Sequence, residues 1–140
     1  MIPVLMLALA LVGQNDDMPA REGVEGLWTN PSGSVQVRTG PCGQKLCGWV
    51  VWANEKAKAD AARNGGGALI GATLLRNYQP SGRARWTGQL YVPDMKASFG
   101  STITLVDAQT LRVRGCALGG LLCRTQDWRR IGAGGAASAR

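Results

Sequence analysis

Short stretches in which hydrophobic and polar residues alternate recur along the chain between residues 24 and 131. A two-residue period places alternate side chains on the two faces of a β-strand. Near the C-terminal end, for example, Leu111 and Val113 alternate with Arg112 and Arg114. The pattern predicts about eight strands, over residues 24–29, 34–38, 48–52, 73–78, 85–91, 98–105, 110–115 and 123–131.

Turn-forming residues separate these stretches, notably at residues 30–33, 40–41, 80–82, 93–94 and 107–109. Short alternating strands joined by short turns indicate an antiparallel meander. About eight such strands can close into a barrel whose interior is filled by side chains or holds one small ligand. We therefore predict an all-β fold in the form of a small antiparallel barrel, with a two-sheet β-sandwich as the alternative.

Residues 53–64, ANEKAKADAARN, interrupt the strand pattern. The segment is rich in Ala and Lys and offers no apolar face at helical spacing. We expect it to form a mobile loop with at most a turn or two of helix.

The two ends of the chain also depart from the pattern. Residues 1–14 form an apolar run that is too short to cross a bilayer, with a small-x-small motif at residues 8–10, and they predict a signal peptide. A buried N-terminal helix or strand is the alternative. We expect residues 15–22 to form a polar linker, residues 23–131 the barrel domain, and the Gly/Ala/Ser-rich residues 132–140 a disordered tail. This organisation predicts a protein of the periplasm or a secreted protein.

Four cysteines form two local pairs, Cys42 with Cys47 and Cys116 with Cys123. Neither pair has the C-x-x-C spacing of a redox site, and a chain without His offers poor zinc ligation at these spacings. In an exported chain we expect structural disulfides. Three connectivities are possible. We favour Cys42–Cys47 and Cys116–Cys123, because residues that flank a hairpin loop face each other at a separation a disulfide spans, although a crossed pairing would remove more chain entropy.

Residues 117–122, ALGGLL, join the last two predicted strands and carry three leucines and no charge. We favour a cap over one end of the barrel for this segment. An exposed contact patch is the alternative.

The formal net charge of +7 indicates a basic surface, which favours anionic partners such as lipid headgroups or envelope polymers. Export argues against nucleic acid, so we expect no nucleic-acid partner. Arginines on neighbouring predicted strands form either an ordinary solvated face or a basic stripe whose binding would be sensitive to salt. The arginines concerned are Arg83, Arg85, Arg112, Arg114, Arg124, Arg129 and Arg130.

Aromatic residues give a stronger indication of a binding site. Trp49 and Trp52 lie three residues apart on one predicted strand, so we expect them to point to opposite faces of the sheet. One would face the interior, and the other would either meet a planar or anionic ligand or lie beneath the loop that follows. The speculative ligand-binding residues are Trp49, Trp52, Trp86, Tyr91, Asp94, Arg112 and Arg114.

The first and last predicted strands carry a related pair of signals. A Gly-x-Trp ending at Trp28 opens the first strand, and Trp128 precedes Arg130 at the end of the last. This arrangement resembles the calycin pattern, in which the Arg covers the Trp across the barrel floor by a cation–π contact of about 0.5 to 2 kcal/mol. The resemblance implies a calycin- or lipocalin-like barrel closed by Trp28, Trp128 and Arg130.

Five longer stretches are more specific in combination: GLWTNPSGSVQV, PCGQKLCGWVVW, ALIGATLL, WTGQLYVPD and LRVRGCALGGLLCRTQDWRR. In this order, over residues 26–130, the chain resembles the domain of unknown function 2147 family of small exported bacterial proteins. The resemblance implies a signal peptide, a compact β-barrel-like domain and no established activity. The chain departs from the family pattern after Trp52, where only Asp60 and Asn64 survive, and at Asp94, which is not followed by the usual Gly-Lys.

Side chains that could carry catalysis are few. A chain without His has no His-based triad, general base or His metal ligand, so we expect neither a metal nor a cofactor. We expect a monomeric, non-catalytic module of the cell envelope that binds a small apolar or anionic ligand or an envelope partner. The alternatives are a structural or stress-response interaction protein with a basic docking face, and a hydrolase using Asp or Tyr chemistry, for instance at Asp94 and Asp127.

Overall fold

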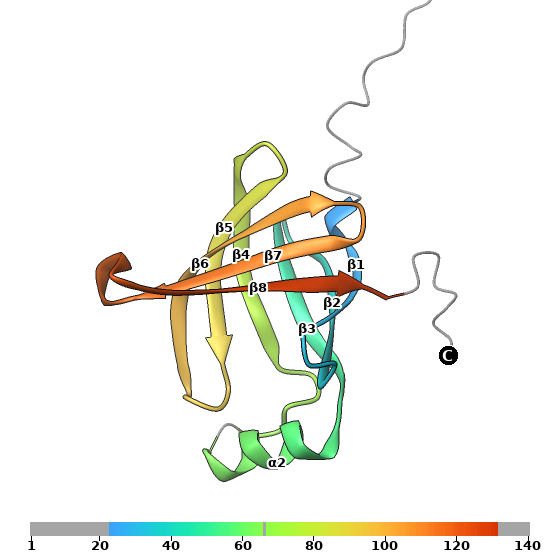
Figure 1. Ribbon diagram of the computed structural model, residues 1–140, viewed down its shortest axis with the longest axis vertical. Helices are drawn as coiled ribbons and strands as arrows, with labels where there is room; N and C mark the ends of the chain where they lie inside the picture. The colour runs from blue at the N-terminus through green and yellow to red at the C-terminus, as the bar shows by residue number, and fades with distance from the viewer. Residues whose placement is uncertain (1–22, 66, 132–140) are drawn as a thin grey trace, which may run out of the picture.

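Consecutive strands pair antiparallel all the way round a closed barrel, because the first strand also pairs with the last (Figure 1). The computed structural model describes residues 23–65 and 67–131. The strands are β1 (Gly26–Thr29), β2 (Val35–Cys42), β3 (Lys45–Ala53), β4 (Thr73–Gly82), β5 (Arg85–Val92), β6 (Ala97–Asp107), β7 (Thr110–Ala117) and β8 (Leu122–Arg130). The predicted antiparallel barrel is confirmed, and the β-sandwich alternative is wrong. The expected signal peptide (1–14), linker (15–22) and tail (132–140) lie outside the described residues.

Alternate residues of each strand face a common interior, as the sequence period predicts. Cross-strand pairing places Trp86 opposite Ile103 and Ile103 opposite Val113, and all three side chains are buried. Leu111 is also buried, whereas its neighbour Arg112 is exposed. Full burial of each large apolar side chain contributes about 1.5 to 3 kcal/mol, so the inward face of the sheet is what stabilises the barrel.

Two strands continue through residues that predicted turns. β2 runs through Gly40 and Pro41, and β4 runs through Pro80 to Gly82, so the tight turns fall at residues 43–44 and 83–84 instead. β1 pairs with β2 only as far as Thr39. Pro41 therefore lies on a strand edge, where its missing N–H breaks no pair with β1.

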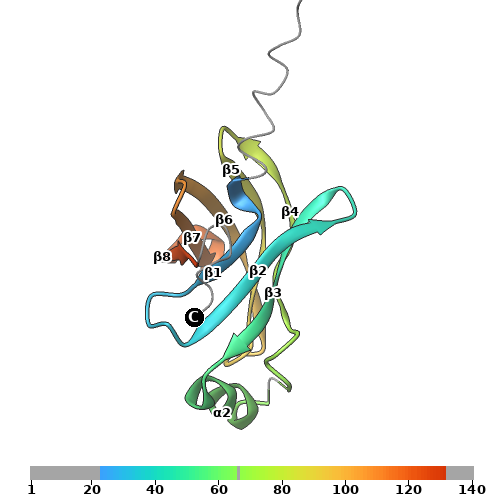
Figure 2. The ribbon, with the colours of Figure 1, turned by 90° about the vertical axis from the view of Figure 1, so that its right-hand side faces the viewer.

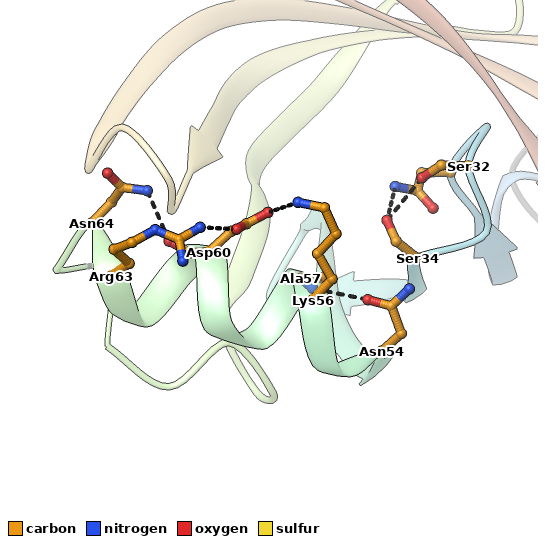
Figure 3. Close-up of polar contacts among 9 residues, drawn as sticks. Ser32, Ser34, Asn54, Lys56, Ala57, Asp60, Arg63 and Asn64 are labelled. Atoms are coloured by element: carbon orange, nitrogen blue, oxygen red, sulfur yellow. Dashed lines mark hydrogen bonds and ion pairs between the residues drawn. The ribbon is translucent and has the colours of Figure 1, made fainter.

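The segment expected to be a mobile loop forms a helix, α2 (Glu55–Arg63). Asn54 is its N-cap, and the Asn54 side-chain oxygen accepts a hydrogen bond of 2.8 Å from the backbone N–H of Ala57 (Figure 3). Ala61 is fully buried against the barrel core. The loop prediction is wrong because the buried face of α2 consists of alanines, whose small side chains give a weak hydrophobic signal.

Ion pairs between neighbouring turns reinforce α2. Lys56 and Arg63 both contact Asp60, and Lys56 is the first cause of the lowered pKa of Asp60 (Figure 3). In both views of the ribbon the helix lies at the same end of the barrel as the β5–β6 turn (Figures 1 and 2). Just beyond the helix, a Cβ at Gly65 would lie 3.3 Å from the Lys96 side chain of that turn. The helix therefore covers part of this end of the barrel.

Arg130 closes the opposite end. Its guanidinium lies 4.3 Å over the Trp28 ring. The same group donates hydrogen bonds to the carbonyls of Gly23, Glu25 and Ala108, the last at 2.8 Å. Burial lowers the pKa of Arg130. The floor of the barrel is therefore built where the first and last strands meet.

Candidate functional site

A cavity of about 530 Å³ opens at the end of the barrel away from Arg130, and we call it the calyx. Its walls are inward side chains of β2 and of β4 to β8, and most of them are apolar. Small-molecule pockets have volumes of about 300 to 1,000 Å³ and combine apolar walls with a few polar groups. The main apolar contributors are Val37, Leu90, Phe99, Val113, Leu122 and Trp128.

Small inward residues form one row in the middle of the barrel. Gly88, Ser101 and Gly115 pair with one another in one row across β5, β6 and β7. A Cβ at Gly88 would lie 2.7 Å from the Tyr78 ring, and a Cβ at Gly115 would lie 3.2 Å from Leu90 Cδ2. At Gly88 the interior is therefore filled by the Tyr78 ring, whereas Gly115 is part of the calyx lining and adds no side-chain volume there.

The short first strand also leaves the calyx accessible along one side. β1 pairs with β8 only at Trp28–Arg130 and Thr29–Arg129. From Leu122 to Asp127, β8 is therefore paired only with β7. Side chains on the inner face of this part of β8 are exposed for that reason.

Arg124 is the charged residue among those that line the calyx. Arg124 pairs with the inward-facing Gly115, so its side chain lies on the inner face of β8. It is nevertheless exposed to solvent, because this part of β8 has no partner on its other side. Within the described part of the chain, no hydrogen bond or ion pair engages the side chain of Arg124. Two residues further on, Gln126 accepts a hydrogen bond of 3.0 Å from Trp128 Nε1, which leaves its amide nitrogen as a donor. The planar fork of an arginine binds a carboxylate or phosphate through two hydrogen bonds.

Two buried hydroxyls lie in the interior beside the glycines of this row. Of the polar side chains in residues 23–65 and 67–131, Tyr78 Oη and Ser101 Oγ are buried without a hydrogen-bond partner. Burial raises the pKa of Tyr78 to about 12, and the nearby Ser101 hydroxyl partly opposes the rise although the two groups do not reach hydrogen-bond geometry. A buried hydroxyl without a partner costs about 1 to 3 kcal/mol, and neither residue lines the calyx.

The structure places Trp49 and Trp52 on the same face of the sheet. Val51 is an extra residue in β3, because Trp52 pairs with Gln36 while Trp49 pairs with Arg38. Gln36 and Arg38 point the same way, so both tryptophans point outward. The expectation of opposite faces is wrong because of a β-bulge. The extra residue, Val51, shifts the alternation by one position, so residues three apart lie on the same face. Neither tryptophan lines the calyx.

Two of the expected ligand-binding residues lie at the rim of the calyx. Tyr91 is part of its lining, and the guanidinium of Arg76 lies 4.3 Å over the Tyr91 ring. Asp94 is exposed in the β5–β6 turn between Pro93 and Met95, both of which line the calyx.

The remaining expected residues are separated from the calyx. Trp86 is buried in the core, and Arg112 and Arg114 point outward from β7. Arg112 donates a hydrogen bond of 2.9 Å to Asp127 on β8 and lowers the pKa of that carboxyl. Asp127 is thus engaged on the outer face, while Asp94 lies in a turn at the open end, and the two carboxylates do not share a cleft.

Sequence reasoning missed the two polar residues of the calyx. The sequence pattern groups Arg124 with the arginines of a basic stripe over neighbouring strands and does not single out Gln126. The missed signal is the strand period, because residues two and four positions before the inward Trp128 share its face. Counting back from a tryptophan already expected in the barrel closure would have identified both.

The two disulfides link Cys42 with Cys47 and Cys116 with Cys123, so the local connectivity is confirmed. Cys116 and Cys123 are directly opposite each other on β7 and β8. Each bridge holds the base of a hairpin, the first between β2 and β3 and the second between β7 and β8.

The described residues hold no helix long and apolar enough to span a membrane. Nor do residues 23–65 and 67–131 bring together three or more His, Cys, Asp or Glu side chains in a group that could hold a metal ion.

Comparison with known proteins agrees with this geometry. A solved structure of protein HP1028 from the human pathogen Helicobacter pylori, described as belonging to the lipocalin family, superposes with a TM-score of 0.62 at 12% sequence identity, covering 79% of this chain and 84% of that one. At this identity the likeness concerns the fold alone. No curated protein gives a significant match. Two disulfides in a lipocalin-like fold are consistent with an extracytoplasmic protein.

The strands that build the floor, the calyx and both disulfides all lie within one matched segment. The sequence profile of a family described as "Uncharacterized protein conserved in bacteria (DUF2147)" matches residues 26–130, from the start of β1 to the end of β8. The chain therefore belongs to this bacterial family, the domain of unknown function 2147 family.

Proposed function

We propose that this protein is a non-catalytic binding protein whose calyx takes a small, elongated apolar molecule with an acidic head group. The observation that carries the proposal is an apolar cavity of about 530 Å³ with one uncommitted arginine, Arg124, at its open side. We further propose that the protein acts in the periplasm or as a secreted protein after removal of residues 1–14 as a signal peptide.

The walls of the calyx favour an apolar body for the ligand. Burial of apolar surface contributes about 25 cal/mol per Å², and the ligand and the exposed lining both lose contact with water on binding. Gly115 is part of the lining and adds no side chain to it. Among the described residues that line the calyx, Arg124 alone is charged, so the walls favour a tail end without a second charge.

The open side favours an anionic head. Arg124 and the Gln126 amide lie two residues apart on the inner face of β8 and supply adjacent donors. A hydrogen bond to a charged group contributes about 1.5 to 3 kcal/mol, which corresponds to roughly 10- to 100-fold in affinity. The head group would then remain near solvent while the apolar body is buried.

The first experiment compares two arginines that differ in the face they occupy. cis-Parinaric acid and its methyl ester are titrated into the protein, and energy transfer from Trp128, which lines the calyx, reports binding. Arg124→Gln is expected to weaken binding of the acid about tenfold or more and to change binding of the ester little. Arg114→Gln is the matched control, because Arg114 is also exposed but points outward from the neighbouring strand. Absence of saturable binding, or equal losses in the two variants, contradicts the proposal.

A second pair of variants tests the cavity itself. Gly115→Val places side-chain atoms against Leu90 inside the calyx and is expected to weaken both the acid and the ester. Gly100→Val is the control, since a Cβ at Gly100 meets no atom within 4 Å and the residue is exposed on β6. Full affinity in Gly115→Val would place the probe elsewhere on the molecule.

A further inference from the structure

The connection between β7 and β8 does not cap the barrel. Its leucines are among the most exposed apolar residues described, with 71% of Leu118, 86% of Leu121 and 61% of Leu122 accessible to solvent. In Figure 1 the connection projects beyond the barrel wall. The expectation of a cap is wrong because β7 and β8 stay paired out to Ala117 and Leu122 and carry the turn away from the opening. We call Leu118, Leu121 and Leu122 the leucine tip.

A disulfide and a short turn constrain the backbone of the leucine tip. The Cys116–Cys123 disulfide ties the two strands together directly below it. Above the bridge, a short 3-10 turn spans Leu118–Gly120. Leu118 has φ +54°, a left-handed conformation that an L-residue with a large side chain adopts at a cost of about 1 kcal/mol or more. The fold thus presents a leucine to solvent at a position where Gly or Asn would be less strained.

The charge around the leucine tip has one sign. Between Asp107 and Asp127 the sequence has no acidic residue. Arg114 and Arg124 flank the tip, one on each face of the hairpin, and neither makes an ion pair within residues 23–65 and 67–131. The leucine tip is apolar, and the two guanidinium groups beside it are free to bind anions. This combination complements a surface with an apolar interior and an anionic outer layer.

The size and shape of the leucine tip distinguish among possible partners. A stable protein interface buries about 800 Å² on each side and requires complementary shape. Three leucines on a narrow, protruding turn cannot supply that area, whether the partner is another protein or a second copy of this chain. A lipid surface needs no complementary shape, because its acyl chains rearrange around an inserted side chain.

We propose that the leucine tip inserts into the surface of a bilayer containing anionic lipids, with Arg114 and Arg124 at the level of the headgroups. Leu122 belongs both to the tip and to the wall of the calyx, and Met95, 62% exposed, lines the calyx from the β5–β6 turn. Docking through the tip therefore places the part of the calyx wall at Leu122 nearest to the lipid surface. The proposal does not depend on calyx binding, because the tip is exposed whether or not the calyx is occupied.

Vesicle co-sedimentation tests the proposal with the disulfide-bonded protein. Binding is expected to vesicles of phosphatidylcholine with phosphatidylglycerol, to weaken as salt is raised, and to be much weaker on phosphatidylcholine alone. Leu118→Ser combined with Leu121→Ser is expected to reduce the partition coefficient about tenfold or more. Val106→Ser is the matched control, because Val106 is 44% exposed at the end of β6 near the barrel floor, away from the open end.

Three outcomes would overturn the proposal. One is a wild-type protein that does not bind anionic vesicles at low salt. Another is equal partitioning of the double-leucine variant and Val106→Ser. The third is sedimentation velocity that finds a wild-type dimer which the double-leucine variant converts to a monomer, since the tip would then join two copies of the chain.

Two further measurements separate this proposal from the calyx proposal. The double-leucine variant should bind cis-parinaric acid with unchanged affinity, which also shows that it is folded. Gly115→Val should lose probe affinity and keep wild-type partitioning onto vesicles, because Gly115 faces the interior. If Gly115→Val fails to bind vesicles, the tip is not an independent docking element.

Discussion

Tyr78→Phe tests the barrel interior most directly. The change removes Oη and keeps the aromatic ring that lies against Gly88. In the described structure Tyr78 Oη is buried without a hydrogen-bond partner, so it contributes a desolvation cost with no compensating bond. At neutral pH we expect the free energy of unfolding of the variant to equal that of the wild type or to exceed it by up to about 1 kcal/mol.

Alkaline pH should change this comparison in a defined direction. The pKa of Tyr78 is raised by burial from 10.0 to about 12 in the folded state. Because the folded pKa is the higher one, the stability linked to the protonated hydroxyl is intact below about pH 10 and is lost as pH rises through about 12. This shift corresponds to a total loss of about 2.7 kcal/mol in the free energy of unfolding of the wild type. About 1.4 kcal/mol of this loss should have occurred at about pH 11.

The assay is urea unfolding followed by tryptophan fluorescence, with both proteins measured at each pH. The difference between wild type and Tyr78→Phe cancels the titration of other groups and any alkaline change in the disulfides, since both proteins share them. Tyr91→Phe serves as the matched control, because that hydroxyl belongs to a half-buried ring at the rim. A difference that stays constant within about 0.3 kcal/mol from neutral pH to about pH 11 would refute the assignment of Tyr78 as a buried, neutral phenol.

Three other substitutions test the elements that frame the calyx. Arg130→Met should lower the free energy of unfolding by about 2 to 4 kcal/mol in urea, because the floor loses a cation–π contact and charged hydrogen bonds to three carbonyls; a loss below about 0.5 kcal/mol would contradict this role. Asn54→Ala should cost about 1 kcal/mol in the same assay by removing the helix cap, whereas Asn54→Asp should keep most of it. Replacing Cys116 and Cys123 together by Ala should lower stability by about 2 to 2.5 kcal/mol, and reducing agent should then have less effect on the variant than on the wild type.

Local features of the sequence determined the number of strands, the antiparallel order and both disulfides. Alternation within a strand depends only on residues two positions apart, and the cysteine pairs lie across single hairpins. The hydrophobic pattern failed to predict the helix α2, where hydrophobic contrast is weak. α2 buries alanines such as Ala61, which carry little hydrophobic contrast, and its cap depends on one asparagine.

The placement of the tryptophans shows why a face cannot be read from one strand alone. Trp49 and Trp52 were expected on opposite faces, and one extra residue, Val51, put both outside. A bulge is visible only when the partner strand is present, because it is defined by two residues opposing one. The same dependence on register turned Arg124 inward while Arg114, across the same pair of strands, turned outward.

By itself the sequence determined a disulfide-linked, eight-stranded barrel with a tryptophan and an arginine at its floor. The tertiary structure alone decided that the barrel is hollow and where its charge lies. The calyx combines inward side chains from strands far apart along the chain, such as Val37, Leu90 and Trp128, and it is open where β8 is paired only with β7. The shape of the cavity depends on side chains from several strands that pairing brings together. No single stretch of sequence includes all of them, so the cavity cannot be predicted from one strand.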